Sequence, residues 1–154
     1  MSTATNMTFE LLDIQRCTIS RHKELDDQQK QFVEQGNTYL RAYNLRNHSS
    51  IVEPTLIYLS DYTKIHFVTQ EAFMELHNYP GIDKHVAHHN EYVREVAKGI
   101  KSLLQYKSTN DMNIHDSLSM NIAMLITDWF EFHLLAADKR LNEFIRYEVN
   151  KEQR

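Results

Sequence analysis

Histidines at helical spacing are the residues of this sequence best suited to chemistry. The chain has nine histidines among 154 residues. His85 and His89 stand four positions apart, as do His66 and Gln70. Neutral imidazole is a good ligand for iron, zinc and copper, and two imidazoles one turn apart on a helix can share an ion. One such pair is weak evidence alone, because histidines fall four apart by chance in many helices.

The composition indicates one helical domain. The sequence has only three Gly and two Pro, and 25% of its residues are charged, so it lacks the turn residues of a β-rich or disordered chain. A length of 154 residues is enough to bury a core without help from a second domain.

Charge and hydropathy exclude several classes of partner. The net charge is -4 and acidic and basic residues are interspersed, so we expect neither a nucleic acid nor a membrane as a partner. The longest apolar run is too short to cross a membrane, and the first residues do not resemble a secretion signal. The single cysteine, Cys17, cannot form an internal disulfide. These features predict a cytoplasmic protein.

Three breaks divide the sequence into four segments that are each long enough for a helix. The breaks read NLRNHSS, NYPG and KSTNDMN, at residues 44–50, 78–81 and 107–113. Between them, apolar residues recur at spacings of three and four, the pattern of an amphipathic helix. We therefore predict an all-α fold, an antiparallel up-down-up-down four-helix bundle at residues 20–150, preceded by an N-terminal arm at residues 1–19.

Polar residues interrupt the apolar stripe of every predicted helix. They are Gln29 in the first, His66 and Gln70 in the second, His85 and His89 in the third, and His133 in the fourth. Counted from the breaks at 1.5 Å per residue, neighbouring sets come level to within about 5 Å. One buried histidine is more often satisfied by a backbone group. Six polar residues in one layer instead favour a metal site.

The sequence around these positions resembles bacterial hemerythrins. The similar stretches are YTKIHFVTQEAFM, YPGIDKHVAHHNEY and WFEFHLLAADKRL, with LDDQQKQF resembling the first-helix motif of the family. The resemblance covers about residues 20 to 145 and implies a hemerythrin-like bundle around a non-haem di-iron site. It implies three histidine ligands on one iron, matched here by His85, His89 and His133. It also implies His66 as a ligand of the other iron and Asp138 as a carboxylate bridging the two.

The sequence departs from the family pattern at two ligand positions. Gln29 stands where the family has a first-helix histidine, and Gln70 stands where it has a bridging glutamate. Asp138 alone would leave a large uncompensated charge around two ferrous ions in an apolar interior, which costs several kcal/mol per ion. We therefore expect one iron rather than two, bound by the three histidines and Asp138, with the second site weak or empty.

The altered half of the site leaves alternatives open. His66 either binds metal directly or holds a metal-bound water with Gln29 and Gln70, which would then make weak or indirect contacts. The alternative without a metal contact is that the two glutamines hydrogen-bond each other and fill the space of the second ion. Glu71 lies five residues after His66 and would turn inward only if the helix widened there.

The spacing of the last two ligands predicts a distortion of the fourth helix. His133 and Asp138 are five residues apart, which rotates them by about 140° on an ideal α-helix, so we expect a π-bulge between them. His22 lies two turns from Gln29 and should not replace the lost ligand. Trp129 is expected to pack beside the site. The remaining histidines are expected in loops or on outer faces: His48, His77, His88 and His115.

The resemblance implies a protein that binds dioxygen or a related small diatomic or peroxide ligand, in storage, delivery or sensing. This is a binding function more than an enzymatic one. One alternative is a mononuclear iron protein with redox or peroxide chemistry at the retained site. The other is a metal-poor structural or signalling module. The sequence predicts neither an oligomeric state nor a protein partner.

Overall fold

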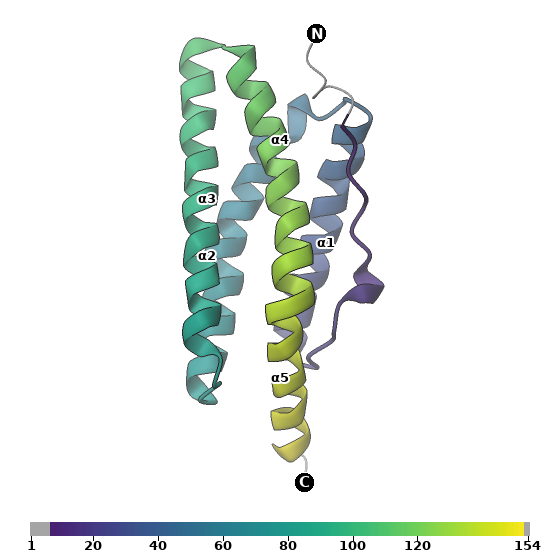
Figure 1. The fold of residues 1–154 in the computed structure, drawn as a ribbon, viewed down its shortest axis with the longest axis vertical. Coiled ribbons are helices and arrows are strands. Elements are labelled where there is room, and N and C mark those ends of the chain that lie inside the picture. The colour runs from purple at the N-terminus through teal and green to yellow at the C-terminus, as the bar shows by residue number, and fades with distance from the viewer. Residues whose placement is uncertain (1–6, 153–154) are drawn as a thin grey trace.

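Helices form the architecture of the part of the chain that the computed structural model describes, residues 7–152 (Figure 1). In chain order the elements are the 3-10 turn η2 (Ile14–Arg16), α1 (Lys23–Asn44), the 3-10 turn η3 (Ser49–Ile51), α2 (Val52–Leu76), α3 (Ile82–Thr109), α4 (Met112–Trp129), the π-helical segment η4 (Phe130–Asp138) and α5 (Lys139–Glu152). Because α4, η4 and α5 follow one another without a break, they form one long column. Four helical columns pack together, and residues 7–152 contain no strand. The predicted all-α bundle of four helices is confirmed.

Local hydrogen bonds set several of the helix ends. The Asp111 carboxylate accepts the backbone N–H of Asn113 at 2.9 Å and so caps α4. His22 Nδ1 accepts the N–H of Leu25 at 3.4 Å at the start of α1. The helix α3 ends where Asn110 adopts a left-handed conformation with φ 55, a common way to stop a helix. These caps fix the lengths of the columns and therefore the heights of the residues along them.

Two apolar clusters fill the interior on either side of a polar layer. The larger cluster includes the fully buried Phe32, Leu59 and Ile122. The smaller cluster lies toward the other end and is built on Met74 and Leu141. On α2 and η4, His66 and His133 lie beside Phe67 and Leu134 of the larger cluster, and the smaller cluster follows at Met74 and Leu141. Their layer is therefore closed off from water by apolar side chains at both ends.

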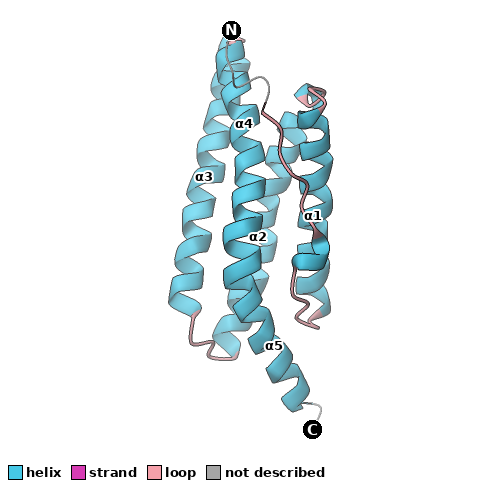
Figure 2. Cartoon of the chain, turned by 45° about the vertical axis from the view of Figure 1, so that its right-hand side comes forward, coloured by secondary structure: helices cyan, strands magenta, loops and turns pink. Residues whose placement is uncertain are grey.

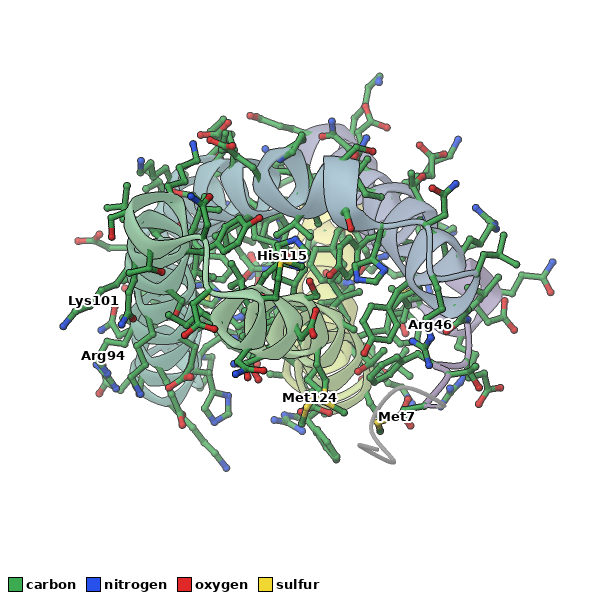
Figure 3. The ribbon with its side chains drawn as sticks, turned by 90° about the horizontal axis from the view of Figure 1, so that it is seen from above. Met7, Arg46, Arg94, Lys101, His115 and Met124 are labelled. Carbon is green, nitrogen blue, oxygen red and sulfur yellow. The ribbon has the colours of Figure 1, made fainter. Side chains whose placement is uncertain are left out.

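The N-terminal arm is held against α1 by two asparagine side chains. The Asn37 amide accepts the N–H of Leu12 at 2.7 Å and donates to its carbonyl at 2.9 Å. Asn44 makes the same pair of bonds to Phe9, both at 2.8 Å. Figure 2 shows the arm as a loop lying along α1, and the view from above places it, near Met7, on the side of the bundle away from α2 (Figure 3). Residues 1–6 of the predicted arm lie outside the described residues.

The helices between residues 7 and 152 include none that is long and apolar enough to cross a membrane. This agrees with the expectation from hydropathy.

Candidate metal centre

A widened helical segment brings the last two predicted ligands together. Residues Phe130–Asp138 form a π-helix, in which hydrogen bonds run five residues apart instead of four. The spacing of five between His133 and Asp138 therefore returns both side chains to one face. His133 Nε2 lies 3.1 Å from Asp138 Oδ1. The predicted π-bulge is confirmed, and it is the local feature on which the geometry of the cluster depends.

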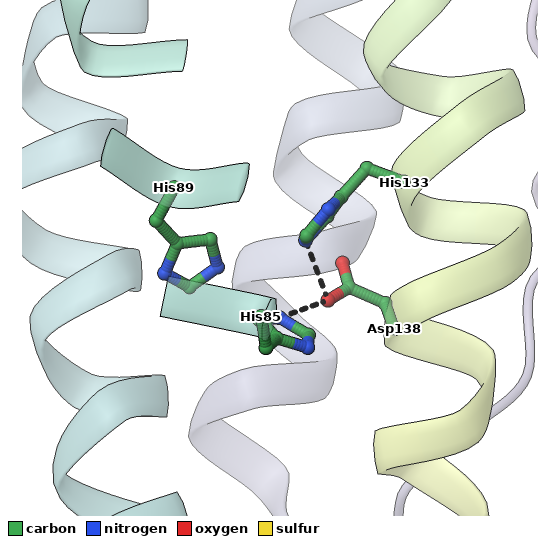
Figure 4. A group of neighbouring side chains, drawn as sticks. All are labelled: His85, His89, His133 and Asp138. Carbon is green, nitrogen blue, oxygen red and sulfur yellow. Dashed lines mark ion pairs between the residues drawn. The ribbon is translucent and has the colours of Figure 1, made fainter. Parts of the chain in front are cut away.

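Four of the predicted site residues converge in the polar layer. His85 and His89 come from α3, and His133 and Asp138 from η4 (Figure 4). One ligand atom from each of the four lies within 4.8 Å of all the others. All four side chains are buried, with at most 3% of the residue exposed. Three imidazoles and one carboxylate at this separation form a donor set suited to a transition-metal ion.

His89 has a free lone pair inside the cluster. Its Nδ1 lies 2.8 Å from Glu71 Oε2 and donates its proton there, which leaves Nε2 as the unprotonated nitrogen. That atom is buried and has no hydrogen-bond partner among residues 7–152. Burial, reinforced by the nearby His85 and His133, lowers the pKa of His89 to about 2. An unpartnered buried acceptor is costly, and a metal ion would relieve that cost.

Asp138 supplies the negative charge of the cluster. Burial alone would raise the pKa of its carboxyl, but the charge and hydrogen bonds of His133 and His85 hold that pKa well below its usual range. Oδ1 lies 3.1 Å from the Nε2 atoms of both histidines. The group is therefore a carboxylate at neutral pH, as a metal ligand must be.

Gln70 contacts two residues of the cluster and does not contact Gln29, the other altered position. Its Oε1 is 2.8 Å from His85 Nε2, and its Nε2 donates to Asp138 Oδ1 at 3.1 Å. The uncharged amide thus bridges two residues of the cluster. The alternative in which Gln70 and Gln29 hydrogen-bond each other is wrong.

Gln29 is buried but turned away from the cluster. Its amide donates to the Thr18 carbonyl at 3.4 Å, and its Oε1 accepts from Asn142 Nδ2 at 3.3 Å. Asn142 also donates to Thr18 O at 2.7 Å. These bonds tie Gln29 to the N-terminal arm and to α5. The arm was the part of the chain whose path could not be predicted from periodicity.

His66 lies in the buried layer but outside the four-residue group. Its Nδ1 is 2.7 Å from Gln28 Oε1, and its ring stacks on Tyr62 with centroids 4.8 Å apart. Burial lowers the pKa of His66 to about 4, so the ring is neutral at physiological pH. Gln28 was not predicted as a partner of His66, although it stands directly beside Gln29 in the first-helix motif. A metal bond to His66 stays a prediction.

Glu71 lies outside the four-residue cluster and contacts His89. The helix α2 has no π-helical turn at this point, and the half-exposed carboxylate reaches His89 from outside the cluster. A carboxylate on the far nitrogen of a ligand imidazole fixes its tautomer and raises its basicity. Its contact with His89 could have been anticipated, because both residues lie close to the polar layer on adjacent helices.

One of the four remaining histidines contradicts its prediction. His115 is buried, with 6% of the residue exposed, and its ring packs on Tyr106 with centroids 4.9 Å apart. The reason is its spacing: His115 lies three residues before Leu118 and four before Ser119, on the buried face of α4. His22 caps α1 and takes no part in the cluster, as expected.

Aromatic walls and a cavity border the cluster. The Trp129 ring stacks on His133 with centroids 3.7 Å apart, and the Phe67 ring stacks on His89 at 3.9 Å. A cavity of ≈ 560 Å³ between α3 and α4 is lined by Tyr92, Trp129 and His133 among others. A small molecule therefore has a route along this cavity to the edge of the cluster.

Comparison of the chain with protein-family models, with curated proteins and with solved structures gives no match. The function must therefore be inferred from the geometry of the cluster and from the sequence stretches around it.

Proposed function

We propose that this chain is a hemerythrin-like, non-haem iron-binding protein that binds dioxygen or a related small molecule. The ion is held by His85, His89, His133 and Asp138. The observation that carries the proposal is the convergence of four buried ligand atoms within 4.8 Å of one another, two of them, on His89 and His133, without a hydrogen-bond partner among the described residues. The short connections between the helices support the antiparallel up-down-up-down order, and the proposal includes a cytoplasmic location.

The donor set suits a single ferrous ion. Three neutral imidazoles and one carboxylate offset part of its charge and leave coordination positions open for a small ligand. Iron bound here would supply reversible redox chemistry and a binding position for dioxygen or peroxide. The stacked rings of Trp129 and Phe67 keep water from the cluster, and Glu71 holds His89 in the tautomer that offers Nε2 to the ion.

The surroundings of the cluster favour one ion over two. Gln70 brings an uncharged amide to the space between His85 and Asp138, where a second ion would need another carboxylate to offset its charge. Gln29 makes its bonds to Thr18 and Asn142 instead. The proposal therefore includes a depleted second iron site.

Metal analysis of anaerobically purified protein tests the proposal. We expect one iron per chain and a change in the visible spectrum on exposure to air. His133→Ala should lose the metal, whereas the matched control His88→Ala should keep it, because His88 lies beside His133 with ring centroids 5.9 Å apart but outside the four-residue group. Stoichiometric metal in His133→Ala would refute the assigned site. Two irons per chain would refute the depleted second site.

A mononuclear iron protein reactive toward peroxide is the second candidate. The cavity that runs along α3 and α4 from Ser102 to His133 offers peroxide a path to the edge of the cluster, which is the observation in favour of this candidate. Sustained consumption of hydrogen peroxide by the iron-loaded protein, abolished in His133→Ala, would select this candidate. Reversible oxygen binding without consumption would exclude it.

A metal-poor structural module is the third candidate. The bonds of Gln70 to His85 and Asp138 satisfy part of the cluster without an ion, which is the observation in its favour. This candidate requires that a chelator change neither the helicity nor the melting temperature. A bound ion stabilises the folded state by mass action, so a clear drop in melting temperature would exclude it.

A further inference from the structure

The outer face of α2 carries more large exposed apolar residues than the outer face of α1 or α3. Ile57 and Val68 are 53% and 63% exposed, and Ile65 and Leu76 are also exposed. Soluble helices normally carry polar residues on the face turned away from the core. The N-terminal arm does not cover this face, because it lies on the other side of the bundle (Figure 3). Exposed apolar residues gathered on one helix face mark an interaction surface.

The centre of this face has the spacing of a helix-packing seam. Ile57, Asp61, Lys64 and Val68 follow one another at intervals of four, three and four residues and are all exposed. At 100° per residue they fall within an arc of about 60°. Alternating steps of four and three are the pattern by which one helix packs along another.

The same four residues are complementary to themselves about a two-fold axis. In an antiparallel pair of α2 helices centred midway between Tyr62 and Thr63, Ile57 meets Val68 of the second copy. Asp61 then meets Lys64 of the second copy, and the symmetry repeats both contacts. Neither Asp61 nor Lys64 forms an ion pair with any residue between 7 and 152. A surface that matches itself under a two-fold rotation is the requirement for a symmetric dimer.

The available area fits a weak dimer. In this register residues 52–73 of the two α2 helices lie alongside each other, so the shared face is about 32 Å long at 1.5 Å per residue. With the adjoining edges of α1 and α3 it is about 20 Å wide, since packed helices lie 8–10 Å apart. The face therefore offers about 600 Å² per copy, or about 1,200 Å² in total, which is the lower limit for specific interfaces.

We propose that two copies of this chain form a symmetric dimer through the outer faces of their α2 helices, with Ile57 against Val68 and Asp61 against Lys64. The inference is independent of the metal and of the proposed function. The two ion pairs set the register, and the apolar pairs supply the contact area.

Sedimentation velocity on the full chain tests the dimer. The range from about 1 to about 200 µM covers the association expected of an interface of this size. Asp61→Lys and Lys64→Asp should each weaken self-association about tenfold or more, because both reciprocal pairs become repulsive. An equimolar mixture of the two variants should dimerise again, because each copy then carries charges of one sign at both positions and meets the opposite sign in its partner.

Substitution of an apolar position supplies a second test and its control. Val68→Glu should abolish the dimer, whereas Tyr147→Glu, at a position on α5 that is 65% exposed, should leave it unchanged. Circular dichroism shows whether each variant is folded. The proposal is overturned if the wild-type chain stays monomeric over the whole range. It is equally overturned if Val68→Glu still dimerises, or if the mixed charge variants do not associate.

Discussion

Acid should destabilise the metal-free protein, because two buried histidines remain neutral in the folded state. Burial lowers the pKa of His66 to about 4 and that of His89 to about 2, from an ordinary value of 6.5. Below pH 6.5 the unfolded chain takes up protons on these residues that the folded chain does not. The free energy of unfolding therefore decreases as the pH falls through this window.

The size of the effect follows from the two lowered pKa values. Each histidine reduces the free energy of unfolding by about 1.4 kcal/mol per pH unit below its ordinary pKa. At pH 5 the two together cost about 4 kcal/mol, a large part of the 5–15 kcal/mol typical of a folded domain. Asp138 does not change the free energy of unfolding in this window. The pKa of its carboxyl is lowered in the folded state, so its stabilising contribution is complete above the ordinary value of 3.8 and is lost only as the pH falls below it.

Urea unfolding of chelator-treated protein, followed by circular dichroism at pH 7, 6 and 5, measures this loss. His66→Gln removes one of the titrating groups, so the loss between pH 7 and pH 5 should decrease by about 2 kcal/mol. Equal stability of the wild-type protein at pH 7 and pH 5 would show that the two imidazoles are not held neutral by burial, and the reasoning would fail.

Three further changes give separate tests. Glu71→Gln should weaken metal binding by about 10–100-fold in competition with a chelator, because the ligand imidazole loses its orienting carboxylate; unchanged affinity would count against that role. Gly36→Ala should lower the free energy of unfolding by about 1–3 kcal/mol in urea, because the new Cβ would lie 2.8 Å from Ile126 Cγ2; a stabilised variant would contradict this packing. Burial raises the pKa of Cys17 to about 11, so iodoacetamide should label it slowly at pH 7 and about tenfold faster per pH unit up to pH 10, whereas a flat rate would contradict burial of the thiol.

The bundle and the three histidines of the cluster could be predicted because both depend on local periodicity. Apolar spacing located the four long helices, and a constant rise per residue placed His85, His89 and His133 at one height. The spacing of five between His133 and Asp138 predicted the π-helical segment, because no regular α-helix turns both side chains to one face. Asp138 itself came from the resemblance to hemerythrins, and the geometry of a single helix then required a widened turn between it and His133.

The partners of the glutamines could not be predicted in the same way. Gln28 and Gln29 are adjacent on α1, and periodicity places Gln29 on the inner face. The amide group of Gln29 hydrogen-bonds Thr18 in the arm and Asn142 on α5. Gln28 instead contacts His66. These contacts join residues that are far apart in sequence, so the periodicity of a single helix does not predict them. The burial of His115 was missed although its spacing of three from Leu118 already placed it on the inner face of the fourth helix.

The two glutamines give the most direct test of why a second ion should be absent. Gln70→Glu would place a carboxylate between His85 and Asp138, which supplies the missing charge. Combined with Gln29→His, it restores both ligand types of the hemerythrin pattern and should raise the metal content from one ion to two per chain. Gln28→His with Gln70→Glu is the matched variant, because Gln28 is the residue that contacts His66 in the structure. Two ions only in the Gln28 variant would show that the sequence alignment is displaced by one residue on α1. If neither variant binds more metal than the wild-type protein, the charge explanation for the depleted site is wrong.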